Sequence, residues 1–150
     1  MPEWNLTGSR MFSHAAKFID AYHNVLQPLC RETGLPPMAM DILLFVANNP
    51  DRNTASDICQ CRGLKPGIVS VHVDRLVNEG LVRAEAANDR RKTRLTCTEK
   101  AQPIVAEGRK LQKAFANKLS AGINESDMES FRRTLTRFGE NLEDILRHGL

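Results

Sequence analysis

The sequence predicts a mostly helical fold with one small β hairpin, and three observations carry that prediction. Apolar side chains recur at steps of three or four residues through most of the chain, which is helical spacing. Two short helical segments flank a tight Gly-Leu-Lys turn at residues 63–65. Two short runs rich in β-branched residues, 81–86 and 93–98, follow directly and are joined by a basic loop.

Size and composition restrict the chain to a small globular class. Its 150 residues, 41% apolar and 26% charged, suffice for one hydrophobic core, so a single unit over residues 1–150 is expected. No run of about 18 apolar residues could span a bilayer, and residues 1–12 lack the pattern of a signal peptide. We therefore expect a cytoplasmic protein without a membrane partner, whose four cysteines are free thiols.

Positive charge is concentrated in the middle third of the chain. From Pro50 to Lys100 there are ten Lys or Arg and seven Asp or Glu, a net charge of +3. The remaining residues contain eleven of each kind and are neutral overall. A basic centre between balanced flanks favours a polyanionic partner that is met by one segment.

Two helices are predicted before this basic segment. Residues 10–31 carry an apolar stripe, and the glycine and prolines of "ETGLPP" end that helix. The stripe consists of Met11, Ala15, Phe18, Tyr22, either Val25 or Leu26, and Leu29. Pro37 suits the first turn of a second helix, which is expected to be deeply buried.

A helix-turn-helix is predicted next. Thr54 followed three residues later by Asp57 is a variant of the capping box, and it opens a short third helix that ends at Gly63. Pro66 opens a fourth helix, and Gly80 ends it. The expected buried stripe of the fourth helix is Val69, Val73, Leu76 and Val77.

The hairpin behind these helices carries "NDRRKTRLT", residues 88–96, at its tip. Two short helices followed by a basic hairpin is the order of a winged helix, in which the second helix enters the major groove of DNA. A basic hairpin is usually a solvated turn, but its position directly behind a helix-turn-helix favours nucleic-acid binding.

The last third of the chain predicts two more helices. Residues 99–120 place Ile104 or Val105, Gly108, Leu111, Phe115 and Leu119 on one face. From Ser126 onward, an apolar seam follows steps of three and four residues, which is the seven-residue repeat of a helix that packs on a partner helix. The seam consists of Met128, Phe131, Leu135, Phe138, Leu142 and Ile145. That partner is either a second chain or another helix of the same chain.

Residues 54–101 resemble the winged helix of the MarR family of bacterial transcriptional regulators. The matching features are Leu64, "VDRLVNEGLV" at 73–82, the Asp-x-Arg of Asp89 and Arg91, and "LT" at 95–96. The sequence departs from the family pattern at Arg62, where an apolar residue is usual, and at Ala101, where glycine is common. The flanking helices also follow the family order.

The resemblance implies roles for the hairpin. Asp89 would shape the wing through a salt bridge, Arg91 would reach a phosphate or the minor groove, and Arg90, Lys92 and Arg94 would contact the DNA backbone. It also implies a fold that is mostly α with a small β wing: a winged helix-turn-helix DNA-binding lobe at 36–98, with dimerisation helices at 10–33 and 99–148.

Helical periodicity, independently of the family, defines the face of the fourth helix that could read DNA. Gly67 lets the backbone approach, Ser70 can bond a base edge or a phosphate, and Val71 suits the methyl group of thymine. Asp74 shares this face but would repel phosphates, and it receives no reading role. The predicted DNA-binding residues are Thr54, Lys65, Pro66, Gly67, Ser70, Val71, Arg75, Arg90, Arg91, Lys92 and Arg94.

The sequence indicates the residues of an effector site less specifically than those of the DNA-binding surface. Family members respond to small aromatic or phenolic ligands, and the residues here that would line such a pocket, or equally serve as core, are Phe18, Tyr22, Met38 and Met40. Cys30 and Cys61 are the candidate redox residues of an alternative thiol-based sensor. The four histidines are scattered, so no metal site is expected, and no cofactor either.

The predicted function is that of a homodimeric, sequence-specific DNA-binding transcriptional regulator. It would act as a repressor on a pseudo-palindromic operator in double-stranded DNA and be released by the small ligand. The alternatives are a redox-sensing regulator of the same fold and a winged-helix module that binds an acidic protein. No nucleophile-base pair or phosphate-binding loop indicates an enzyme.

Overall fold

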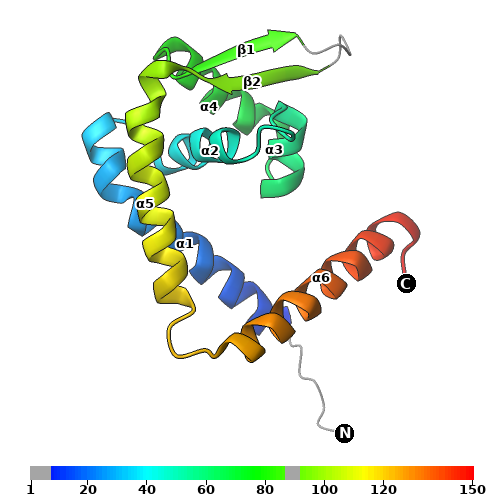
Figure 1. The fold of residues 1–150 in the computed structure, drawn as a ribbon. Helices are drawn as coiled ribbons and strands as arrows, with labels where there is room; N and C mark the ends of the chain where they lie inside the picture. The colour runs from blue at the N-terminus through cyan, green and yellow to red at the C-terminus, as the bar shows by residue number, and fades with distance from the viewer. Residues whose placement is uncertain (1–7, 87–91) are drawn as a thin grey trace, which may run out of the picture. The chain divides into compact units, whose positions relative to one another are not determined.

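The computed structural model of the chain describes residues 8–86 and 92–150. It contains six α-helices in these ranges, one 3₁₀ turn and a two-stranded antiparallel sheet (Figure 1). The elements are α1 (Gly8–Thr33), α2 (Pro37–Asn48), α3 (Ala55–Arg62), α4 (Pro66–Asn78), β1 (Val82–Ala86), β2 (Thr93–Cys97), η1 (Glu99–Ala101), α5 (Gln102–Leu119) and α6 (Glu125–His148). The mostly helical prediction with a small β wing is confirmed, each element within a few residues of its expected place.

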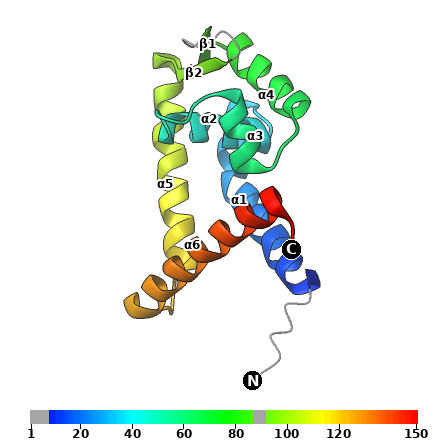
Figure 2. The same cartoon turned by 90° about the vertical axis from the view of Figure 1, so that its right-hand side faces the viewer.

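The chain divides into two compact units, Met1–Phe115 and Ala116–Leu150. The first has its core around α2, which lies between α5 on one side and α3 and α4 on the other in both views (Figure 1, Figure 2). Every residue of α2 from Ala39 to Val46 is buried, as its apolar sequence predicted. Helix α2 therefore lies behind the helix-turn-helix and forms the core on which it rests.

The apolar stripe of α4 differs from the prediction at one position. Val69, Val73 and Leu76 are buried against the core, but Val77 is 37% exposed. Three residues already cover the contact surface, and the helix ends at Asn78, one position later. The expectation that Val77 is a core residue was wrong.

Helix α5 begins later than the sequence indicated, because residues Glu99–Ala101 form a 3₁₀ turn. Val105 and Gly108 are buried on its inner face, while Leu119 at its end is 57% exposed. Helix α5 approaches α2 closely at Gly108, where an added Cβ would lie 2.4 Å from Leu44 Cδ2. Glycine is needed here for lack of space.

The second unit is dominated by α6. Asn124 caps this helix by accepting a hydrogen bond from the Asp127 backbone N–H at 2.8 Å. None of the residues that the structure describes in α6 is buried. The predicted seam is a surface: Phe131, Leu135, Leu142 and Ile145 are between 44% and 59% exposed, and the other two seam residues are half-buried.

Candidate nucleic-acid interface

The helix-turn-helix is fixed at its start by a complete capping box. The Thr54 hydroxyl accepts a hydrogen bond from the Asp57 N–H at 3.1 Å, and the Thr54 N–H donates to Asp57 Oδ2 at 3.1 Å. The Thr54 hydroxyl also donates to this carboxylate at 2.8 Å, and these hydrogen bonds lower the pKa of Asp57. Such a cap stabilises a helix by about 1 kcal/mol. Thr54 is half-buried with its hydroxyl in the cap, although the sequence placed it among the DNA-binding residues.

The turn into α4 leaves one face of the first half of that helix open to solvent. Gly63 ends α3 in the left-handed conformation at φ 63°, and Lys65 and Pro66 begin α4. The expected reading face is exposed at Lys65, Pro66, Gly67, Ser70 and Val71. A Cβ added at Gly67 would meet no described atom within 4 Å, so this face has room for a close partner.

Sequence reasoning missed Ile68 on this surface. Its side chain is 46% exposed, and Val71, one helical turn further on, is 67% exposed. Two uncovered β-branched residues at i and i+3 form an apolar strip beside Lys65 and Ser70. The i, i+3 spacing of Ile68 and Val71 is visible in the sequence. An isoleucine is usually a core residue, however, and only the structure shows that Ile68 is exposed.

The hairpin is attached to the helix-turn-helix by backbone contacts. Leu95 is fully buried, and its N–H donates to the Asn53 carbonyl at 2.9 Å. Arg94 forms a β-bridge with Thr54 just before α3, and β1 packs on α4. Lys92 and Arg94 are both exposed on this anchored hairpin. The predicted wing residues Asp89, Arg90 and Arg91 lie outside the described residues.

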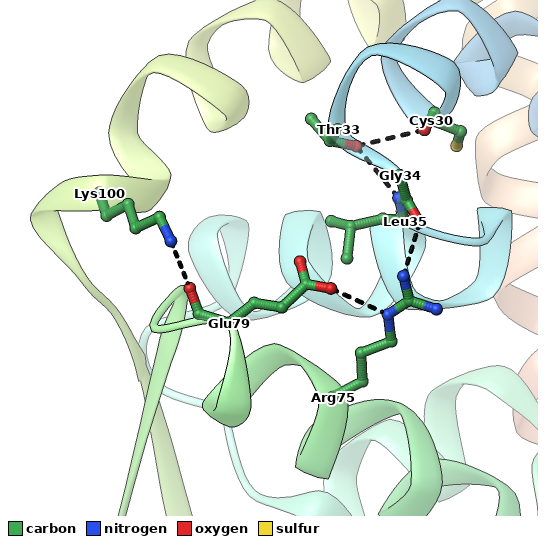
Figure 3. A network of polar contacts seen from close by, with 7 residues as sticks. All are labelled: Cys30, Thr33, Gly34, Leu35, Arg75, Glu79 and Lys100. Carbon is green, nitrogen blue, oxygen red and sulfur yellow. Dashed lines mark hydrogen bonds and ion pairs between the residues drawn. The ribbon is translucent and has the colours of Figure 1, made fainter.

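Arg75 lies on α4 but has two partners within the protein. Its Nε is 3.0 Å from Glu79 Oε1, and its Nη2 donates to the Gly34 carbonyl at 2.7 Å (Figure 3). The sequence placed Arg75 among the DNA-binding residues. The structure instead directs its guanidinium to the turn between α1 and α2.

A cavity of about 590 Å³ opens within the first unit. It is walled by aromatic and aliphatic side chains of α1, α2 and α5, with the end of α3 at one side. Phe115 meets Phe18 edge-on at 5.4 Å and Tyr22 at 5.5 Å between ring centroids. The residues around the cavity are Phe18, Ile19, Tyr22, His23, Met38, Asp41, Asn48, Cys61, Arg62, Leu64, Gln112 and Phe115.

The wall of this cavity carries an ion pair in which only the carboxylate is buried. Asp41 is 4% exposed, and its two carboxylate oxygens accept hydrogen bonds from Arg62 Nε at 2.9 Å and Nη2 at 3.2 Å. The Arg62 guanidinium also lies over the Phe45 ring at 5.0 Å. The family resemblance implied an apolar residue at this position; the arginine found here is instead paired with Asp41, and this pair joins the end of α3 to α2.

A chain of side-chain hydrogen bonds also runs from the cavity to α5. Gln112 Nε2 donates to the Tyr22 hydroxyl at 2.7 Å, and Asn48 Nδ2 donates to Gln112 Oε1 at 3.0 Å. Arg109 donates in turn to Asn48 Oδ1 at 2.9 Å. Burial raises the pKa of Tyr22, so its hydroxyl is protonated at neutral pH.

Three of the four predicted pocket residues surround this cavity, namely Phe18, Tyr22 and Met38. Met40 does not, because it is fully buried in the core of α2. A helix turns by about 100° per residue, so Met38 and Met40 point in nearly opposite directions. Of the two roles left open for Met40, pocket wall or core, the structure supports the core.

The two candidate redox cysteines differ in their surroundings. Cys30 is 4% exposed, and burial raises the pKa of its thiol, which disfavours the reactive thiolate. Cys61 is exposed at the edge of the cavity. Within the described ranges all four cysteines are free.

In the same ranges, no three His, Cys, Asp or Glu residues lie close enough together to hold a metal ion. No described helix is long and apolar enough to cross a bilayer.

The model of the MarR family matches residues 33–92, which hold the helix-turn-helix and most of the hairpin. A solved structure of a transcriptional regulator named PA3341 is 25% identical and superposes with a TM-score of 0.75, covering 91% of this chain and 98% of that one. The helix-turn-helix region of this chain matches the MarR family.

Other MarR-like structures share the fold at lower identity. A MarR family regulator from Listeria monocytogenes, solved with a 26mer DNA, is 17% identical with a TM-score of 0.74 and 93% coverage of both chains. CouR from Rhodococcus jostii RHA1, solved with p-coumaroyl-CoA, is 19% identical with a TM-score of 0.66 and covers 85% of this chain and 88% of its own. The family and the fold are those of transcriptional regulators rather than enzymes.

Proposed function

We propose that this chain belongs to the MarR family and is a homodimeric repressor that reads a pseudo-palindromic operator and leaves it when a small aromatic ligand binds. The observation that carries this function is the exposed first half of α4 beside an anchored basic hairpin. A helix with a free face and a neighbouring cationic loop can contact the major groove and the backbone of one duplex together.

On α4, the reading face offers three kinds of contact. Lys65 supplies a cation for guanine or phosphate, Ser70 a hydroxyl, and Val71 with Ile68 an apolar strip for thymine methyl groups. Gly67 lies between them without a side chain, so the backbone can come near the bases. This set makes no bidentate amide contact, and base readout by one α4 helix is therefore modest.

On the hairpin, Lys92 and Arg94 would bind phosphates and set the register of the protein on the duplex. The resemblance adds Arg90 and Arg91 as further contacts, shaped by Asp89. Each neutralised phosphate adds about 0.9 to the slope with which log affinity falls against log salt concentration, so binding should be steeply salt-dependent.

Two copies are needed because the reading helix α4 of one chain (one reader) makes so few specific contacts with the bases. The α6 seam and the exposed Met11, Phe12, Phe18 and Ile19 of α1 are apolar surfaces on the same chain. We infer that a second copy covers them, as the seven-residue spacing of the seam favours a helical partner. Paired readers about 34 Å apart would match half-sites one turn of DNA apart. The solved DNA complex of the Listeria relative supports a duplex partner.

The division between backbone and base contacts can be tested by salt titration. Lys92→Ala should weaken binding to every duplex alike and reduce the salt slope by about one per subunit, because it removes a phosphate contact. Ser70→Ala should change the preference among sequences and leave the slope intact. Affinities would be measured by fluorescence anisotropy on several duplexes at four salt concentrations.

Two results would contradict these roles. If both substitutions had equal effects on all duplexes, Ser70 would not be a groove contact distinct from Lys92 as a backbone contact. A flat salt dependence of the wild type would favour the alternative of a protein-binding module, whose wing meets an acidic protein partner.

The cavity of the first unit is the proposed ligand site. Its aromatic edge at Phe18, Tyr22 and Phe115 can stack on a ring. Polar substituents could bind the Tyr22 hydroxyl, or a guanidinium N–H of Arg62 other than the two that Asp41 accepts. The complex of CouR with p-coumaroyl-CoA supports an aromatic ligand class. Because Arg62 is the last residue of α3, a ligand that contacts it touches the helix-turn-helix directly.

Phe115→Ala should weaken binding of phenolic acids such as 4-hydroxycinnamate about tenfold and leave DNA affinity unchanged. The substitution removes a ring from the cavity wall without touching α3 or α4. Calorimetric titration would measure the ligand affinity, and Met40→Leu in the adjacent core serves as a control that should not alter it. An unchanged affinity in Phe115→Ala would move the ligand site elsewhere.

A further inference from the structure

The last turn of α4 is joined to two other elements by side-chain contacts (Figure 3). Arg75 reaches the turn after α1 through the Gly34 carbonyl at 2.7 Å. Lys100, in the 3₁₀ turn η1 that precedes α5, donates from Nζ to the Glu79 carbonyl at 2.7 Å. The Glu79 carboxylate in turn holds Arg75 Nε at 3.0 Å. One salt-bridged pair at the end of α4 thus contacts both the turn after α1 and the 3₁₀ turn η1.

The acceptor for Arg75 belongs to a well-fixed turn. Gly34 has a φ of 74°, and its N–H donates to the Cys30 carbonyl at 2.8 Å. The Thr33 hydroxyl donates to the Leu29 carbonyl at 2.8 Å, and Leu35 behind it is 2% exposed. The Gly34 carbonyl is therefore a rigid point to which α4 can be tied.

The C-terminal side of α4 is similarly held by Thr98, the residue directly after β2. The Thr98 hydroxyl donates to the Gly80 carbonyl at 2.6 Å, and the Thr98 N–H donates to the Leu81 carbonyl at 3.0 Å. These bonds fix the end of α4 along its axis, while Arg75 ties its flank to Gly34. Removing Arg75 would leave the end attached and free the helix to tilt.

We propose that Arg75 is a positioning residue: with Glu79 it sets the angle of α4 against the α1–α2 turn, so that the reading face meets the bases correctly. Its charge is matched by Glu79 and one of its amino groups is bound by Gly34, which leaves it poorly suited to neutralise a phosphate. The positioning role rests on the proposed function, since an angle matters only if α4 reads DNA.

The length of α4 turns a small tilt into a large displacement. Gly67 lies eight residues before Arg75, about 12 Å along the helix. A tilt of about 5° at Arg75 moves Gly67 by about 1 Å, which exceeds the placement tolerance of roughly 0.5 Å for a specific contact. The pair itself is exposed, 45% for Arg75 and 36% for Glu79, and such pairs add little to stability. Substitution should therefore change the angle without unfolding the protein.

The test compares a specific with a non-specific duplex. The specific probe is the tightest duplex that the wild type selects from a randomised pool, and the other is a shuffled duplex of equal composition. Arg75→Ala should lower the ratio of the two affinities about five- to tenfold with an unchanged salt slope. Arg75→Lys should lower it as well, because one ammonium group does not span both acceptors in the fixed fork geometry of arginine. Glu79→Gln should act in the same direction.

A matched control is available on α5. Lys110 pairs with Glu107 at 2.8 Å in an exposed ion pair, and Lys110→Ala removes the same charge from the same kind of contact. The affinity ratio should not change in that variant. A loss of folded protein would lower binding to both duplexes equally, so the ratio separates positioning from general destabilisation.

Two outcomes on DNA would overturn the positioning role. A salt slope reduced by about one with an unchanged ratio in Arg75→Ala would make Arg75 a phosphate contact. Tighter binding of both duplexes by Glu79→Gln would mean that its charge only repels DNA. If the wild type bound no duplex at all, the proposed function would fail first, and the role of Arg75 in reading with it.

Hydrogen exchange tests the link without DNA. Arg75→Ala should speed amide exchange about tenfold at residues 76–79 and at Leu35, on the two sides of the contact, and leave α6 unchanged. Unchanged exchange at both places would show that the pair does not hold α4, and would overturn the inference while leaving the proposed function intact.

Discussion

Leu135→Glu is expected to convert the protein into a monomer and to lower its affinity for a palindromic duplex at least 100-fold. Leu135 is 54% exposed at the centre of the α6 seam, so a charge there need not disturb the fold of one chain. In a dimer the same charge would be buried among apolar side chains without a partner, at a cost of several kcal/mol. Sedimentation velocity would report the mass.

The loss on DNA follows from the linkage of two readers. When one reader is bound, the second binds as though present at an effective concentration near the millimolar range, which raises affinity by about 10² to 10⁴. A monomer keeps only the single-site affinity. Thr136→Glu, exposed on α6 one residue outside the seam, adds the same charge and should leave both mass and affinity unchanged.

A dimer that persists in Leu135→Glu would place the subunit contact away from the seam. The apolar residues of α1, with Phe12 78% exposed, would then be the remaining candidate surface. The same experiment therefore also shows which apolar face the second copy covers.

Gly108→Ala is expected to lower the free energy of unfolding by about 2 kcal/mol. Alanine favours a helix over glycine by about 1 kcal/mol, so a loss would mean that steric conflict outweighs propensity. The added Cβ would lie 2.4 Å from Leu44 Cδ2 and 2.9 Å from Cδ1, and Leu44 is fully buried. Helix α5 would have to move away from α2. Urea denaturation followed by circular dichroism would measure the change.

Gly139→Ala is the matched control for this steric effect. Gly139 lies within α6, where a Cβ would meet no described atom within 4 Å. The same substitution should therefore stabilise the protein by up to about 1 kcal/mol through helix propensity. A gain of stability in Gly108→Ala as well would show that Leu44 yields without cost and that α5 and α2 are not in tight contact.

Local chemistry explains why so much of the fold was predictable. Thr54 and Asp57 form the capping box within one helical turn, and Pro37 and Pro66 open their helices as their fixed φ requires. The exposed face of α4 and the α6 seam follow from periodicity alone. Each of these features depends on residues at most a few positions apart, so the sequence contains them directly.

The misassigned positions depend on contacts between distant segments. Arg62 is satisfied by Asp41, 21 residues away, and Arg75 by Gly34, 41 residues away. Neither partner could be inferred from spacing, so Arg62 seemed out of place and Arg75 seemed free for DNA. Met40 was left open between pocket and core, and Val77 was assigned to the core, for a related reason: periodicity defines a face of a helix but not what covers that face.

By itself, then, the sequence determined the order and ends of the helices, the basic hairpin and the apolar faces, because caps, turns and side-chain periodicity act over a few residues. Only the tertiary structure decided which charges are paired, which side chains surround the cavity and why Gly108 lacks a side chain. Those properties arise where segments far apart in the chain pack together, and the distances between such segments are set by the whole core.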